Sequence, residues 1–365
     1  MSKGVISRGI SAPLIKEGDN ITSIVVNAIL EATKKTTVIP VPVKTEDGGQ
    51  TFNTVEKVTY DLNDKDVIGV TESVVARALG QYVFVDDIAA DIEKKYGKDA
   101  TIVLIAPIYS RNRFSMILKG IARAAKKLVF YMPEFDEVGN PRGVNPFTGV
   151  NIEEYYADIC AAENCECVMD GNEWKNRAYP VLDCRLHSKQ LPKPTKMVYY
   201  HLDEICSDAS PDWGLLGTNK STEERLKLFP TVDSANKVCR IIKKNIRKKT
   251  GKDVIVCIYG DGCFKDPVGC IWEFADPVTM PGYTDKELIE STPNEIKLKA
   301  FIDEGMTEEE IEESIREKKD LKGSMASQGT TPRLYRDLLA SLMDLTSGSG
   351  DRATPIVLIQ NYFRD

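Results

Sequence analysis

Basic residues that follow an apolar run give the sequence its first candidate anion site. Residues 101–107 read as a strand and residues 114–127 as a helix, so Ser110, Arg111 and Arg113 stand at the helix start. Free backbone N–H groups, the helix dipole and two guanidinium groups attract a carboxylate or a phosphate. A capped, solvated helix start is the structural alternative. On the functional interpretation, Arg111 and Arg113 hold an acidic substrate.

A second candidate site follows another buried strand, predicted at residues 254–259. Asp261, Lys265 and Asp266 come directly after that strand, and α/β proteins place ligands at the carboxyl ends of strands. The carboxylates can hold a divalent cation and the lysine can meet a phosphate. An Asp-Gly turn is the structural alternative.

A glycine-rich loop is the third candidate. Thr346-Ser347-Gly348-Ser349-Gly350-Asp351 lies between a predicted helix at 334–345 and a predicted strand at 355–362. Small residues let backbone N–H groups approach an anion, and the hydroxyls add donors. No Gly-Lys-Ser/Thr follows, so this is not a Walker loop. Phosphate binding and a flexible surface connection are both open.

Histidine and cysteine usage limits the metal chemistry. The chain has two histidines and nine cysteines. Neither His187 nor His201 has a partner at helical spacing, which argues against a histidine-built zinc site. A metal would therefore be held by carboxylates, which favours Mg²⁺ or Mn²⁺. The cysteines are odd in number and lack Cys-x-x-Cys spacing, so a reducing cytoplasm is expected.

Composition excludes several classes of protein. The chain has 365 residues, of which 42% are hydrophobic and 28% charged, and its net charge is −7. These values fit a globular protein of about two domains. The negative charge gives no general attraction for nucleic acid or an anionic membrane surface. No apolar stretch approaches the roughly 18 residues of a transmembrane helix, and the first residues lack the apolar core of a signal peptide.

Alternating helix and strand patterns position these sites and predict an α/β or α+β fold of mixed sheets with flanking helices. The composition shifts toward Pro, Gly, acidic residues and Cys from residue 133 to about 207. We therefore divide the chain into an N-terminal part at 1–132, an insertion at 133–207, and a C-terminal part at 208–365 with the phosphate and metal site. Further elements are predicted as helices at 20–34, 152–162, 234–250 and 307–319 (with a Thr307–Glu310 capping box) and strands at 37–43, 66–71, 128–132 and 196–200.

Five segments, in order, resemble the coenzyme F420-0:γ-glutamyl ligase family. The likeness covers most of residues 10–80 and 210–362. Pro13–Asp19 resembles the family's opening nucleotide-binding segment, 66–80 resembles "GDVLVVTxKIVSKAEG", 214–219 resembles "GIDxSN", 250–264 resembles "TGKxVxVIxxDxxGRxxR", and 338–362 resembles "NLLMGEGGDGIPVVVVRG".

The resemblance implies an α+β homodimer that uses GTP (or ATP) with Mn²⁺ or Mg²⁺. It also implies a reaction in which a carboxylate is activated as an acyl phosphate and attacked by the amine of L-glutamate. The matching positions place these residues against the nucleotide: Pro13, Leu14, Ile15, Lys16, Glu72, Ser73, Arg77 (a Lys in the family), Asn219, Thr346, Ser347, Gly348, Ser349, Gly350 and Asp351.

The acidic positions depart from the family pattern. Leu216 stands where "GIDxSN" has an Asp, Tyr259-Gly260-Asp261 stands where the family has Asp-Thr, and serine replaces the acid of the glycine-rich loop. The metal site is then either lost or rebuilt from carboxylates elsewhere. The expected ligands are Asp212, Asp261, Asp266 and Asp344, with Asp351 as a further possibility.

These patterns favour a cytoplasmic, nucleotide-dependent amide-bond ligase. It would add L-glutamate, or a similar amino acid, to an acidic small molecule through an acyl phosphate, with Asp261, Lys265, Arg111 and Arg113 as catalytic residues. One alternative is a phosphohydrolase or kinase on the same nucleotide and metal site. The other is a non-catalytic nucleotide-binding regulator, which the missing acidic ligands favour.

Overall fold

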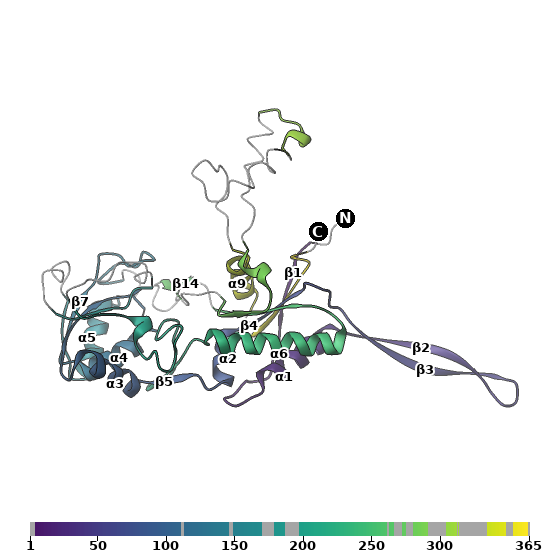
Figure 1. The fold of residues 1–365 in the computed structure, drawn as a ribbon, viewed down its shortest axis with the longest axis horizontal. Helices are drawn as coiled ribbons and strands as arrows, with labels where there is room; N and C mark the ends of the chain where they lie inside the picture. Colours follow the sequence, from purple (N-terminus) through teal and green to yellow (C-terminus); the bar gives the residue numbers. More distant parts are fainter. Residues whose placement is uncertain are drawn as a thin grey trace.

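The chain forms two lobes joined by a small sheet, with a long β-hairpin extending from the first lobe (Figure 1). This computed structural model combines helices with mixed sheets and confirms the α+β prediction. It gives the backbone alone at 263–265 and 272–274. The residues it describes are 4–110, 113–145, 149–169, 179–186, 197–260, 263–265, 272–274, 280–290, 304–311, 313, 334–347 and 353–363.

The first lobe is built on a five-stranded sheet in the order β1–β17–β4–β13–β16. β4 and β13 are parallel, β17 is antiparallel to both β1 and β4, and β16 is antiparallel to β13. Every residue of the three central strands is buried, as expected for a sheet covered on both faces. The strands are β1 (Ile6–Ile10), β4 (Val67–Thr71), β13 (Ile255–Tyr259), β16 (Gly282–Tyr283) and β17 (Ile356–Gln360).

Helices cover the two faces of this sheet. Alternate residues such as Ile68 and Val256 pack toward α1 (Ile21–Thr33) and α6 (Val232–Thr250). The residues between them face α9 (Tyr335–Thr346) and the short helix η4 (Lys286–Ile289). Side chains capping α1 and α6 hold these helices at their starts: Asn20 accepts from Ser23 N, and Thr231 from Ser234 N. The predicted helices at 20–34, 234–250 and 334–345 are thereby confirmed.

Gly69 of β4 is required by the close approach of α9. A Cβ at this position would lie 2.2 Å from Met343 Sδ and 3.1 Å from Tyr259 Cδ1. Met343 therefore packs directly against the strand backbone. The absent side chain lets α9 lie flat on the sheet.

The second lobe contains a five-stranded sheet in the order β10–β9–β6–β7–β8, in which all neighbours are parallel. The strands are β6 (Thr101–Ile105), β7 (Lys127–Tyr131), β8 (Glu166–Met169), β9 (Val181–Asp183) and β10 (Tyr199–His201). Helices α3 (Val85–Tyr96), α4 (Phe114–Ala124) and α5 (Ile152–Ala162) pack with one face of the sheet.

The strand order of this sheet reverses beside β6. The chain proceeds from β6 through α4 to β7 and through α5 to β8, and then returns to place β9 on the opposite side of β6. A reversal of this kind is a topological switch point. The predicted division at residue 133 falls between β7 and β8, which are adjacent strands of one sheet.

A three-stranded sheet joins the lobes. β12 (Arg225–Lys227) lies between β11 (Asn219–Thr222) and β5 (Tyr82–Phe84), and both pairings are antiparallel. The chain leaves the first lobe along α2 (Glu72–Ala78) and β5, and it returns along β12 to α6. The chain thus enters and leaves the second lobe through two paired strands, β5 and β12.

The hairpin consists of β2 (Lys34–Lys44) and β3 (Gln50–Tyr60), paired along their full length. Every residue of the two strands except Tyr60 is exposed. The hairpin extends well away from the rest of the first lobe (Figure 1). The predicted strand at 37–43 is confirmed inside β2. Two-stranded hairpins are marginally stable alone in water.

Two smaller features complete the described chain. β14 (Cys263–Lys265) pairs with β15 (Trp272–Phe274), and the short helix η3 (Leu202–Glu204) follows β10. The predicted capping box is confirmed, because Thr307 N donates to Glu310 Oε2 at 2.8 Å and Glu310 N to Thr307 Oγ1 at 3.3 Å. Among the helices of the described residues, none is long and apolar enough to cross a membrane.

Candidate functional site

Four chain segments begin or end at one edge of the five-stranded sheet. Three of them lead in sequence to predicted nucleotide residues, and the one after β13 leads to predicted metal and catalytic residues. β1, β4 and β13 run in the same direction and end at this edge, whereas β17 begins there. Thr71 N donates to Pro355 O at 3.0 Å, and Ala12 N donates to Ala353 O at 3.0 Å. The edge therefore gathers the segments after β1, after β4 and after β13 with the one before β17, although they are far apart in sequence.

A buried ion pair fixes the start of α2 at this edge. Lys227 Nζ lies 3.1 Å from Glu72 Oε1, and their side chains are 5% and 0% exposed. Lys227 comes from β12, where it pairs across from Asn219 of β11. The pair thus connects the small sheet to the end of β4 and brings Asn219 toward the same edge. Lys227 is a residue that the sequence analysis missed, since a single lysine between two leucines carries no pattern.

The end of β4 also carries a buried hydroxyl. Thr71 is 1% exposed, and within the described part of the chain its Oγ1 has no hydrogen-bond partner. Ser73 is half-buried and Arg77 is exposed on the α2 surface. A buried donor without a partner at a strand end suits an anionic ligand, which is an observation in favour of phosphate binding at this edge.

The segment after β1 lies beside α2. Ile15 is buried, whereas Leu14 is 76% exposed and Pro13 and Lys16 are also exposed. Lys16 N donates to Asp19 Oδ2 at 2.6 Å, which closes a turn, and Gly18 N donates to Ala78 O at 3.0 Å. These bonds hold the segment at the sheet edge with its charged side chain outward.

The glycine-rich loop is described only at its start. Thr346 Oγ1 lies 2.8 Å from Ser7 Oγ and donates to Leu342 O at 2.6 Å, and Ser347 N donates to Met343 O at 2.7 Å. Thr346 and Ser347 therefore close the end of α9 against β1. The other predicted members of this loop, Gly348, Ser349, Gly350 and Asp351, lie outside the described residues.

Two of the four predicted metal ligands, Asp212 and Asp344, lie within the described structure. Asp212 Oδ2 accepts a hydrogen bond from Val232 N at 2.8 Å and so supports the start of α6. Asp344 is half-buried on α9. Asp261, Asp266 and the side chain of Lys265 lie outside the described residues. Among the residues that are described, no group of three or more His, Cys, Asp or Glu side chains could hold a metal ion.

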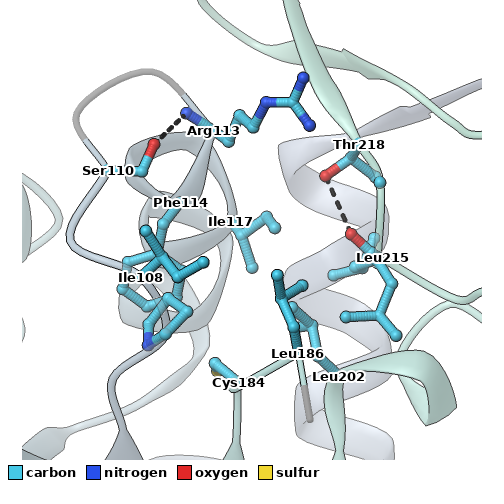
Figure 2. A pocket seen from close by; sticks show the side chains of 13 residues that line it. Ile108, Ser110, Arg113, Phe114, Ile117, Cys184, Leu186, Leu202, Leu215 and Thr218 are labelled. Carbon is cyan, nitrogen blue, oxygen red and sulfur yellow. Dashed lines mark hydrogen bonds between the residues drawn. The ribbon is translucent and has the colours of Figure 1, made fainter. Parts of the chain in front are cut away.

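A cavity lies at the switch point of the second lobe. It is bounded by the segment that follows β6, the segment that follows β9, and a segment before β11 (Figure 2). Arg113, at the start of α4, is 9% exposed, and its N–H donates to Ser110 Oγ at 3.1 Å. Ser110 O accepts from Tyr156 OH at 2.9 Å, which ties this turn to α5. The other predicted arginine, Arg111, lies outside the described residues.

Beside the cavity, β9 and β10 carry a buried polar cluster. Asp183 accepts two hydrogen bonds from Arg185, at 3.0 and 2.7 Å, and a third from Tyr199 OH. His201 contacts Arg185 O through Nε2 at 2.8 Å and Asp203 Oδ1 through Nδ1 at 2.5 Å. Burial lowers the pKa of His201, but the Asp203 carboxylate and the Arg185 carbonyl outweigh it, and the net pKa is raised.

The cysteine of this region is not a nucleophile. Cys184 lines the cavity, and burial raises the pKa of its thiol well above the ordinary value. Its sulfur therefore stays protonated near neutral pH, whereas nucleophilic attack requires the thiolate. Cys184 contributes to the cavity as a small apolar residue.

These features agree with a comparison to protein families. A family model described as F420-0:Gamma-glutamyl ligase matches residues 9–361, which is nearly the whole chain. The chain is therefore a γ-glutamyl ligase-type enzyme by class, and it belongs to the F420-0:γ-glutamyl ligase family. No curated protein matches the chain.

Proposed function

We propose that this protein is a nucleotide-dependent ligase that joins L-glutamate, or a similar amino acid, to an acidic small molecule. The observation that carries the proposal is the meeting of four segments at one edge of the first sheet, three of which lead in sequence to predicted nucleotide residues. The buried Thr71 hydroxyl at that edge adds a donor for an anion. Family membership supports the ligase class.

The proposed reaction passes through an acyl phosphate. A substrate carboxylate oxygen attacks the γ-phosphorus of GTP or ATP, the bond to the bridging oxygen breaks, and the nucleoside diphosphate leaves. The amine of L-glutamate then attacks the acyl carbon, inorganic phosphate leaves, and the amine proton passes to solvent. In this proposal Thr71, Ser73 and Lys16 bind the phosphates, and the Lys227–Glu72 pair holds α2 in place. Dependence on Mg²⁺ or Mn²⁺ stays a prediction, and no step is assigned to a metal, because the described carboxylates form no site.

Nucleotide binding is tested first by thermal unfolding of the full chain with GTP or ATP, each with and without Mg²⁺ or Mn²⁺. A ligand present at 100 times its Kd adds about 2.7 kcal/mol to the free energy of unfolding. We expect a clear rise in the unfolding midpoint with one nucleotide, and Thr71→Val should reduce it. If neither GTP nor ATP raises the unfolding midpoint, the proposal is contradicted.

Phosphate release then separates the reaction classes. A ligase releases inorganic phosphate only when both an acid substrate and L-glutamate are added. Release that needs neither compound identifies a phosphohydrolase, and phosphate transfer without amide formation identifies a kinase. Binding without any turnover identifies a regulator.

We further propose that the enzyme is a homodimer in which a second copy covers the hairpin. One face of the hairpin presents Ile39, Val41 and Val55, which are 42%, 39% and 51% exposed. Light scattering of the full chain should give twice the monomer mass of 40.6 kDa, and Val41→Glu should lower it. A monomeric wild type would overturn this assembly.

A cytoplasmic location completes the proposal. The described cysteines are all free, and six of the seven are buried. Free thiols persist in a reducing compartment.

A further inference from the structure

A row of cations runs along the exposed face of α6. Arg240, Lys244 and Lys248 are exposed and follow one another at intervals of four residues. Side chains at this spacing lie on one face of a helix, about 6 Å apart along its axis at roughly 1.5 Å per residue. We call these three residues the α6 row. Lys243 and Arg247 form a second row beside it, so that α6 gathers five cations within nine residues.

The five cations line a hollow on the surface of the first lobe. Thr284, which follows β16, completes the lining, and the volume is about 460 Å³. Among the described residues that line this hollow, none is acidic. Pockets of about 300–1,000 Å³ hold small molecules. The space therefore fits a compact ligand, and the charge around it selects an anion.

The described chain neutralises only the second row. Lys243 Nζ lies 2.7 Å from Asp285 Oδ1 and 3.5 Å from Asp253 Oδ1. Arg247 Nη1 lies 3.6 Å from the same Asp253 oxygen. Within the part of the chain that the structure describes, no member of the α6 row forms an ion pair. Three positive charges are therefore open to a ligand.

The α6 row contributes little to the stability of the fold. Like charges four residues apart on a helix repel one another and destabilise it slightly. The helix dipole favours cations in the last turn, which accounts for Lys248. It does not account for Arg240 and Lys244, which lie before that turn. An anionic ligand gives a reason for the whole row.

The hollow and the proposed ligase edge lie at opposite ends of β13. Thr284 N donates to Val256 O at 2.9 Å, which places the hollow at the start of this strand. The ligase edge lies beyond its last residue, Tyr259. From Val256 to Tyr259 the strand rises roughly 10 Å, at about 3.3 Å per residue. A ligand in the hollow therefore does not occupy the nucleotide site.

We propose that this hollow binds a linear oligophosphate, with one phosphate group for each cation of the α6 row. A chain of linked phosphates carries charge on every group, so it contacts the whole row at once, whereas a single phosphate or carboxylate cannot. Arginine contacts a phosphate through two parallel N–H groups, and lysine contacts it as a point charge. The site follows from charge and shape, and it does not depend on the proposed ligase reaction.

Calorimetric titration of the full chain with orthophosphate, pyrophosphate and tripolyphosphate, without Mg²⁺, tests the proposal. The titration is made in about 0.05 M salt, where the Debye length exceeds roughly 10 Å. Each added phosphate should tighten binding about two- to fivefold, the range for exposed charge pairs. Raising the salt to about 0.5 M should weaken tripolyphosphate binding roughly tenfold. If tripolyphosphate does not bind, or binds no more tightly than orthophosphate, the proposal is overturned.

A triple variant locates the binding on α6. Arg240→Met, Lys244→Met and Lys248→Met together should weaken tripolyphosphate binding about tenfold to hundredfold. Without ligand, the unfolding midpoint of this variant should stay the same or rise, because repulsion between like charges is removed. Unchanged tripolyphosphate binding in the folded triple variant would refute the site.

A second triple variant is the matched control for net charge. It replaces three exposed lysines that lie away from the hollow, Lys44, Lys98 and Lys126, by methionine. This control should bind tripolyphosphate as wild type does. If the two triple variants weaken binding equally, the effect comes from the overall charge of the protein and the site is refuted.

GTP and tripolyphosphate distinguish the two sources of a phosphate chain. If wild type binds one more equivalent of GTP than the α6 triple variant, the hollow takes the triphosphate of a nucleotide. If the variant loses only tripolyphosphate, the hollow takes a free oligophosphate. Tripolyphosphate binding that persists in the α6 triple variant and falls in Thr71→Val belongs to the ligase edge and overturns the site.

An acidic peptide tests the chemical class of the ligand. A linear oligoglutamate that binds as tightly as tripolyphosphate would assign the hollow to an acidic protein segment and overturn the phosphate assignment. Phosphate release with L-glutamate tests the ligase proposal independently, and the α6 triple variant should retain it. The two proposals can therefore fail separately.

Discussion

Removing the lysine of the buried Lys227–Glu72 pair should destabilise the protein strongly. The two charges lie 3.1 Å apart with side chains 5% and 0% exposed. At an effective dielectric constant of about 20 their attraction is about 5 kcal/mol. Lys227→Met removes the lysine cation from a buried ion pair, and such changes cost about 3–5 kcal/mol. We expect a loss in this range.

Urea denaturation followed by circular dichroism measures this loss. The double variant Lys227→Met with Glu72→Gln removes both charges together, so it should recover at least half of the lost stability. Lys35→Met is the matched control, because the Lys35–Asp61 pair is 63% and 48% exposed and should contribute under about 1 kcal/mol. Nucleotide-induced stabilisation should fall in both Lys227 variants. A cost for Lys227→Met no larger than that of Lys35→Met would refute the reasoning.

Three further predictions concern the frame around the sites. Gly69→Ala should cost about 1–3 kcal/mol in urea denaturation, since the new Cβ meets Met343; a neutral result would mean that α9 shifts freely. The raised pKa of His201 means that its protonated form stabilises the fold below its ordinary value of about 6.5 and that this contribution is lost as pH rises through the folded pKa. The free energy of unfolding of His201→Gln should therefore decline less from pH 6 to pH 9 than that of wild type. If the two pH profiles are parallel, the contact between His201 and Asp203 does not cause the pH dependence. Asn20→Ala removes the cap of α1 and should lower the free energy of unfolding by about 1 kcal/mol in thermal unfolding. An unchanged free energy would mean that the capping hydrogen bond contributes no more than a hydrogen bond to solvent.

Local patterns predicted most single elements but not the second sheet. The 3.6-residue period of α6 and the continuous apolar run of β13 are complete within their own segments, so both were predictable. β9 has three residues, too few for any periodicity, and it was not predicted. The pairing of β9 with β6 joins segments about 80 residues apart, and such pairing is decided by tertiary packing.

The candidate site was predictable to a similar degree. The resemblance named residues after β1, around β4 and around β17, and the register explains how they meet at one edge. Lys227 was not predictable, because its importance comes from burial beside Glu72 and not from a motif. The cavity of the second lobe was anticipated only at Arg113. Its opposite wall includes Leu215 and Thr218, which lie in the 214–219 segment that the resemblance connected with the nucleotide and not with a cavity.

The position of β17 sets the order in which the protein can fold as it is synthesised. β17 lies between β1 and β4, yet it follows every other strand of that sheet in the chain. The first lobe therefore cannot close its sheet until about residue 360 has left the ribosome. The last strand of the second lobe's five-stranded sheet ends at His201, and this lobe is bounded by β5 and β12. It can therefore fold before the first lobe can complete its sheet. Domains generally fold as units in the order of their synthesis, and here a domain encoded in the middle of the chain finishes before the one that encloses it.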